Sequence, residues 1–295
     1  MGKLTFLAAV LAVVACVSLA AGPLLLHCAP PAFGAARVTT ISDPSLFAQS
    51  AARILDRDFP NKDISYVLMD AQMGRLLASR WPEASRPIPL GSLVKPFAAL
   101  AYTGQHDDRY PIFVCRGKAS GCWQTRPHGR LDISSALAYS CNSYFRDLTS
   151  RLTGAEMQDI AAQFGLDPPD PRLTGPPLMG VGTRWQISPL HMAHAYQELV
   201  RRRDEPGVPE ILAGLADSAK WGTGSAAGRV LKREDVLAKT GTAACQHTPR
   251  APGDGLAILI APADQPELLL MIRVHGVPGS RAALIAAQML LSLQQ

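Results

Sequence analysis

Hydrophobic periodicity divides the chain into strand segments near both ends and helical segments between them. Apolar and β-branched residues predict a strand over 64–70, a turn over 71–74 and a second strand over 75–80. Three further strands are predicted late in the sequence, over 236–243, 255–261 and 267–274. Apolar residues at helical spacing predict helices over 44–55, 92–102, 133–152, 156–164, 188–203 and 280–293.

This order of elements predicts an α+β fold. Strands from both ends of the chain are expected to pair in one antiparallel sheet, while the middle helices form a second lobe. The pattern therefore predicts one antiparallel sheet together with an all-α lobe. The Pro/Gly-rich stretch over 167–182 is long enough to be a functional loop rather than a linker.

The N-terminal region has the pattern of a targeting segment. After Lys3, residues 4–26 are uncharged and almost wholly apolar, and a helix of about 20 such residues spans a bilayer. We expect residues 1–28 to be a membrane anchor or signal segment, residues 29–44 a linker, and residues 45–295 the folded domain. Cleavage near Ala32 and lipidation at Cys16 remain alternatives to an uncleaved anchor. All three place the domain outside the cytoplasm.

Composition limits the class of protein. Of 295 residues, 47% are hydrophobic and 18% are charged, which excludes a disordered chain. The net charge of +5 is mild, and no block of Lys and Arg interleaves with aromatic residues, so nucleic-acid binding is not expected.

The six cysteines lack the paired C-x-x-C spacing of a zinc site, so we expect neither a metal nor another cofactor. Cys115 and Cys122 bracket a short Gly-containing loop. In an oxidising compartment they are predicted to form a disulfide, with two free thiols as the alternative.

The first of three short motifs is Ser92-Leu-Val-Lys95, at the start of a predicted helix. Residues three apart lie on one helix face, so the amine of Lys95 is expected near the hydroxyl of Ser92. A buried lysine with a lowered pKa can take the proton of a serine nucleophile. Taken alone the motif is weak, because Ser92 is equally suited to be a helix N-cap.

The second motif is Ser140-Cys141-Asn142. Ser140 is a candidate to relay a proton between the lysine and a leaving group. Asn142 is a candidate to orient Lys95 and to hold a substrate amide. Polar residues within a helix often bond only locally, so this motif too means little alone.

The third motif is Lys239-Thr240-Gly241-Thr242, in a predicted strand near the edge of the sheet. Lys239 and either threonine hydroxyl can bind a carboxylate. Gly241 allows a substrate backbone to lie close to the strand. The backbone N–H of Thr242, together with that of Ser92, can form an oxyanion hole.

The three motifs together have the S-x-x-K, serine-containing and K-T-G signature of β-lactamases and penicillin-binding proteins. The chain resembles the transpeptidase domain of penicillin-binding proteins over roughly residues 60–295. Further segments carry the resemblance: 88–97, 122–145, Gly180-Val-Gly182 with 187–193, and Gly222-Thr-Gly224. High-molecular-weight members carry a large domain ahead of this region, whereas only a short linker is expected here.

This resemblance implies a three-layer α/β/α sandwich on an antiparallel sheet, with an all-α lobe. It also implies two-step acyl transfer. Ser92 would attack a D-Ala-D-Ala-type peptidoglycan stem peptide with Lys95 as general base, and Ser140 and Lys239 would pass the proton to the leaving D-Ala. The acyl group would then go to an amine or to water, and a β-lactam would stall as the acyl-enzyme. The implied partners are stem peptides, β-lactams and other cell-wall synthesis proteins. The implied location is the bacterial cell envelope, either anchored in the inner membrane or secreted to the periplasm.

Two other functions compete with this interpretation. A class A β-lactamase needs a glutamate in an E-x-x-L-N loop, and none of Glu156, Glu198, Glu205 and Glu210 lies in that pattern. A class D-like β-lactamase would use Lys95 in carboxylated form, but the expected Y-G-N sequence is missing. The third hypothesis is a non-catalytic penicillin sensor or assembly module.

Overall fold

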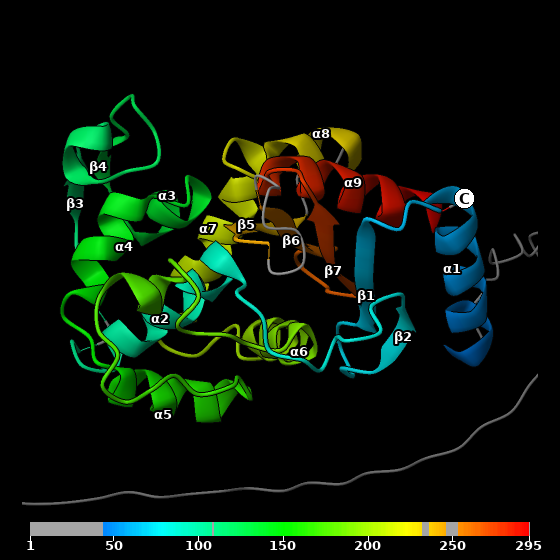
Figure 1. Ribbon diagram of the computed structural model, residues 1–295, viewed down its shortest axis with the longest axis horizontal. Coiled ribbons are helices and arrows are strands. Elements are labelled where there is room, and N and C mark those ends of the chain that lie inside the picture. The colour runs from blue at the N-terminus through cyan, green and yellow to red at the C-terminus, as the bar shows by residue number, and fades with distance from the viewer. Residues whose placement is uncertain (1–43, 108, 232–235, 246–252, 295) are drawn as a thin grey trace, which may run out of the picture. The chain divides into compact units, whose positions relative to one another are not determined.

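A five-stranded antiparallel sheet forms the centre of the structure, a computed structural model that describes residues 44–107, 109–231, 236–245 and 253–294. The strand order is β2-β1-β7-β6-β5, so the N-terminal hairpin pairs beside the C-terminal strands (Figure 1). The strands are β1 (Ile64–Asp70), β2 (Leu76–Ser79), β5 (Leu237–Ala243), β6 (Asp254–Ala261) and β7 (Leu268–His275). β1 and β6 are buried almost along their whole length, which explains why their sequences are continuously apolar rather than alternating.

Helices cover both faces of this sheet. On one face α1 (Pro44–Asp58), α8 (Ser225–Leu231) and α9 (Gly279–Ser292) enclose a core that includes Tyr66, Leu259 and Leu270. The opposite face, with Val67, Ile258 and Met271, packs in a second core against the remaining helices. The predicted α+β sandwich on an antiparallel sheet is confirmed.

Apart from α8, the helices between β2 and β5 form the all-α lobe, which carries a small two-stranded ribbon (Figure 1). Its helices are α2 (Lys95–Thr103), α3 (Ile133–Ala138), α4 (Asn142–Thr149), α5 (Gly154–Phe164), α6 (Pro189–Arg201) and α7 (Val208–Lys220). The 3-10 turns are η1 (Gly91–Val94), η2 (Gly117–Ser120) and η3 (Pro176–Met179). The ribbon pairs β3 (Phe113–Cys115) with β4 (Gly129–Leu131). The sequence did not predict this ribbon, because strands of this length show no periodicity.

One predicted helix is wrong in a way that matters for the site. The apolar spacing over 133–152 indicated one continuous helix, but the structure has α3 and α4 with a break between them. Ser140 adopts φ +50° at this break, a left-handed conformation that no helix interior contains. The periodicity persists because both helices bury their apolar faces in the same core.

The predicted targeting segment, residues 1–28, and all but the last residue of the predicted linker lie outside the described residues. In the part of the chain that the structure describes, no helix has the length and apolar character needed to cross a membrane. The described residues all belong to one compact unit, Ile41–Gln295.

Candidate active site

The first motif forms a tight turn that packs directly on strand β5. Ser92 lies in η1, and Lys95 begins α2 immediately afterwards. Gly91 has φ +56°, and a Cβ atom at this position would lie 2.5 Å from the carbonyl oxygen of Thr242. Only a glycine therefore allows the nucleophile turn and the third motif to approach this closely. Gly180 makes a similarly close approach to the backbone of Gly91.

Lys95 is completely buried and is held by the second motif. Its Nζ atom donates to the backbone oxygen of Ser140 at 2.8 Å, to Oδ1 of Asn142 at 2.7 Å and to Oγ of Ser140 at 3.3 Å. Loss of hydration on burial lowers the pKa of Lys95 to about 7. The amine is therefore partly neutral near physiological pH, as a general base must be.

Ser140 connects the two lysines of the site. Lys239, also fully buried, donates from Nζ to Oγ of Ser140 at 3.0 Å and to the backbone oxygen of Thr240 at 2.9 Å. Burial, and then the charge of Lys95, hold the pKa of Lys239 well below its usual value. One hydroxyl thus contacts both amines, which makes a continuous proton path between the first and third motifs.

The remaining motif residues line a cleft of about 650 Å³. Ser92, Ser140 and Asn142 contribute from one side, and Thr240, Gly241 and Thr242 from β5. The structure therefore brings the predicted site residues of the three motifs together, with both buried lysines bonded to Ser140 in the lining of the cleft. Across the described residues, no hydrogen bond joins the Ser92 hydroxyl to Lys95. Such contacts are often loose in free enzymes and tighten when substrate binds.

The threonines of the third motif have separate partners. Thr240 Oγ1 donates to Oγ1 of Thr223 at 2.7 Å, while Thr242 Oγ1 accepts from the backbone N–H of Gly279 at 3.1 Å. Thr223 was not predicted as a site residue, although it lies in the Gly222-Thr-Gly224 segment that carries part of the resemblance.

Positive charge and an aromatic face complete the cleft. Arg229 and Arg281 line it, and both suit an anionic ligand. Trp123 also lines it, with about half of its side chain exposed and its indole N–H donating to the backbone oxygen of Tyr139. Trp123 lies in the 122–145 segment that carries part of the resemblance, but it was not predicted as a site residue. No sequence signal marked Arg229 and Arg281, because they reach the cleft only through packing of α8 and α9.

The predicted disulfide is not formed. Cys115 and Cys122 are both free thiols in the structure, so this prediction is corrected. The fold directs both sulfur atoms toward Nδ1 of His128, at 3.5 Å and 3.6 Å, rather than into a mutual bond. Cys122 Sγ also lies 3.8 Å from Cys141 Sγ, in the middle of the second motif.

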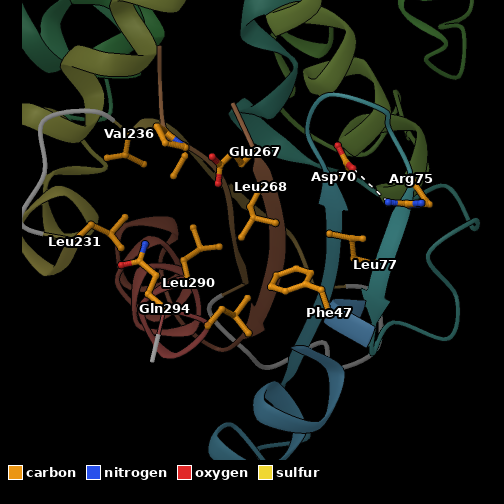
Figure 2. A pocket seen from close by; sticks show the side chains of 13 residues that line it. Phe47, Asp70, Arg75, Leu77, Leu231, Val236, Glu267, Leu268, Leu290 and Gln294 are labelled. Atoms are coloured by element: carbon orange, nitrogen blue, oxygen red, sulfur yellow. Dashed lines mark ion pairs between the residues drawn. The ribbon is translucent and has the colours of Figure 1, made fainter. Parts of the chain in front are cut away.

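A second cavity, of about 370 Å³, has none of this chemistry (Figure 2). Figure 2 shows apolar side chains including Phe47, Leu268 and Leu290 around it, beside an Asp70–Arg75 ion pair of 3.6 Å. It contains no residue of the three motifs, so the candidate active site is the larger cleft.

The sequence model for the penicillin binding protein transpeptidase domain matches residues 64–291. The chain belongs to this family. Membership makes it a penicillin-binding, transpeptidase-type protein of peptidoglycan synthesis, of the serine acyl-transfer kind. No curated protein sequence matches the chain at a significant level.

Solved structures share the fold. PBP2 of Pseudomonas aeruginosa has a TM-score of 0.69 and 16% sequence identity, over 84% of this chain and 73% of that one. PBP2 of Helicobacter pylori, solved with MreC, has a TM-score of 0.70 and 16% identity, over 83% of this chain and 62% of that one. The transpeptidase domain of Burkholderia pseudomallei penicillin-binding protein 3 has a TM-score of 0.64 and 16% identity, over 84% of this chain and 92% of that one.

Proposed function

We propose that this chain catalyses acyl transfer on peptidoglycan stem peptides as a D,D-transpeptidase or D,D-carboxypeptidase, through an acyl-enzyme at Ser92. The observation that carries the proposal is the Ser140 hydroxyl, which contacts the buried amines of both Lys95 and Lys239 beside the cleft that Ser92 lines. Such a site needs neither a metal nor a cofactor for the reaction, since base, relay and nucleophile are all side chains.

In the first step, Lys95 in its neutral form takes the proton from Ser92 Oγ as this oxygen attacks the carbonyl carbon of the penultimate D-Ala. The backbone N–H groups of Ser92 and Thr242 stabilise the resulting oxyanion. The proton then passes through Ser140 to the leaving D-Ala nitrogen as the C–N bond breaks. In the second step, an amine or water attacks the acyl-enzyme and regenerates Ser92. The acceptor of the acyl group distinguishes the two enzymes: a transpeptidase transfers it to an amine and a carboxypeptidase to water.

The substrate carboxylate is proposed to bind at the β5 end of the cleft, near Thr240 and Thr242, with Arg229 and Arg281 adding positive charge. The same charges suit the carboxylate of a β-lactam. We further propose, from the apolar N-terminal segment, that the domain works outside the cytoplasm, in the cell envelope with other cell-wall synthesis proteins.

A fluorescent penicillin tests this function directly. Incubation with the purified protein should produce a covalent adduct at Ser92, located by mass spectrometry, that persists for minutes or longer. Ser92→Ala should abolish labelling, because no neighbouring group replaces the nucleophile. Ser225→Ala is the matched control, since Ser225 lines the same cleft. Labelling that survives Ser92→Ala would contradict the assignment.

The lifetime of the adduct distinguishes the β-lactamase alternative. Among the described residues, none of those lining the cleft is acidic, so these residues offer water no carboxylate base for deacylation. We therefore expect slow release. Turnover faster than about 1 per second, in the ordinary range of enzymes, would favour a β-lactamase. A folded protein that forms no adduct would favour a non-catalytic module.

A further inference from the structure

Three cysteines and a histidine converge beside the catalytic cleft. Cys115 ends β3, Cys122 follows η2, His128 precedes β4, and Cys141 lies at the N-terminus of α4. Their ligand atoms all lie within 4.8 Å of one another. The three thiols are almost completely buried, and Figure 1 shows the ribbon that carries Cys115 beside α3 and α4.

From this convergence we propose that Cys115, Cys122, His128 and Cys141 bind one structural Zn²⁺ ion, which holds the Ser140–Asn142 turn in place. Three thiolates and one imidazole form a ligand set typical of closed, tetrahedral zinc sites. The sequence argued against such a site, because the four ligands are not paired at C-x-x-C spacing. The fold brings them together across a ribbon, a loop and a helix start.

The distances between the ligand atoms match this geometry. In a tetrahedral site, Zn–S bonds of about 2.3 Å and Zn–N bonds of about 2.0–2.1 Å separate two sulfurs by about 3.8 Å and a sulfur from a nitrogen by about 3.6 Å. Cys122 Sγ and Cys141 Sγ are 3.8 Å apart. His128 Nδ1 is 3.5 Å from Cys115 Sγ and 3.6 Å from Cys122 Sγ. These three distances are those of a tetrahedral site, and the remaining pairs of ligand atoms lie within 4.8 Å of one another.

The surroundings also suit bound thiolates. Cys115 Sγ accepts from the backbone N–H of Gly117 at 3.4 Å and lies 3.6 Å from the Ser143 hydroxyl. Donors of this kind stabilise the charge of a ligating sulfur. The ring of His128 stacks on Tyr139, with centroids 4.4 Å apart, and this contact fixes the orientation of Nδ1. Nε2 of His128 is buried without a hydrogen-bond partner in the described residues, so stacking and not a hydrogen bond orients the ring.

The position of Cys141 couples this site to catalysis. Its two sequence neighbours, Ser140 and Asn142, supply all three hydrogen bonds to Nζ of Lys95. Ser140 holds a left-handed backbone conformation that few non-glycine residues adopt. A shared metal ion would link Cys141 to the loop over 115–128. It would hold this turn, and thereby Lys95, in position. The ion would act through position and would not contact the substrate.

Metal content tests the proposal without reference to activity. The full-length protein, purified without chelators, should contain one equivalent of zinc that Cys122→Ser and His128→Ala each lose. His106→Gln is the matched control, because this imidazole bonds and stacks on Tyr102 outside the cluster, and it should keep the zinc. Replacement of the ion in the wild-type protein by Co²⁺ should give the thiolate-to-cobalt charge-transfer absorption of a tetrahedral sulfur site. This spectrum does not depend on whether the variants fold.

The coupling to catalysis has its own readout. Removal of the ion from the wild-type protein by a chelator should lower the melting temperature and slow acylation of Ser92 about tenfold or more, and added Zn²⁺ should restore both. Zinc binding without any penicillin adduct would leave this site standing while the proposed function fails. A wild-type protein that takes up neither zinc nor cobalt would overturn the proposal. So would peptide mapping that finds any two of the three cysteines joined as a disulfide.

Discussion

The lowered pKa of Lys95 predicts a specific pH dependence for acylation. An amine with a pKa of about 7 is half neutral at pH 7, whereas an amine at the ordinary value of 10.5 is neutral in only about one molecule in three thousand. Burial therefore raises the amount of working base at pH 7 by roughly a thousandfold. The base works in its neutral form, so activity must fall as the pH falls through the pKa.

The assay is the second-order rate constant for labelling of Ser92 by a fluorescent penicillin, measured from pH 5 to pH 9. We expect a plateau above pH 8 and a loss of about 50-fold between pH 7 and pH 5, as titration of one general base requires. Lys95→Arg keeps a cation in place but cannot be deprotonated. It should lower the plateau by about 10²–10⁴-fold, the usual contribution of a general base, and should abolish the pH dependence.

The neighbouring lysine provides the control. Lys239→Met removes the amine that shares the Ser140 hydroxyl with Lys95. Loss of a neutral amine leaves the pKa of Lys95 unchanged and loss of a charged amine raises it, so this pKa should stay or rise. The acid limb should therefore persist, at or above pH 7. A wild-type rate constant that is flat from pH 5 to pH 8 would refute the reasoning. If the fall of the rate constant at acid pH disappears in Lys239→Met and survives in Lys95→Arg, the base is Lys239 instead.

Three further predictions follow from the site and the chain. Lys239→Ala should lower the second-order acylation constant by roughly 10- to 150-fold, or about 1.5–3 kcal/mol, which is the range for a hydrogen bond to a charged group. Lys220→Ala is the control, because Lys220 is exposed. An unchanged constant in Lys239→Ala would place Lys239 outside the mechanism. Gly91→Ala should lower the free energy of unfolding by about 1–3 kcal/mol and impair labelling, because its Cβ would contact Thr242. Gly165 has a similar φ but no such contact, so calorimetry should find a smaller loss of stability in Gly165→Ala. Protease added to spheroplasts should digest the domain that follows the apolar segment, and a fully protected domain would contradict its placement outside the cytoplasm.

The difference between the predicted helix over 133–152 and the observed pair α3 and α4 shows what periodicity can miss. Periodicity reports which residues face the core, and both short helices face the same core. It does not report a single left-handed residue such as Ser140, which accepts hydrogen bonds from Lys95 and Lys239. The break that places this serine between the two lysines was therefore invisible until the chain was folded.

Local chemistry was sufficient for the architecture and for the three motifs. Strand and helix patterns act over neighbouring residues, so the antiparallel sheet from both ends of the chain and the helical lobe followed from them. The S-x-x-K spacing likewise acts within one helical turn. Other features depend on contacts between different segments of the chain. They are the proximity of Lys95, Ser140 and Lys239, and the contribution of Thr223 and Arg281 to the cleft. The convergence of Cys115, Cys122, His128 and Cys141 is of the same kind. Such contacts form only when the chain folds, because burial in the common core, rather than any local preference, brings those side chains within bonding distance.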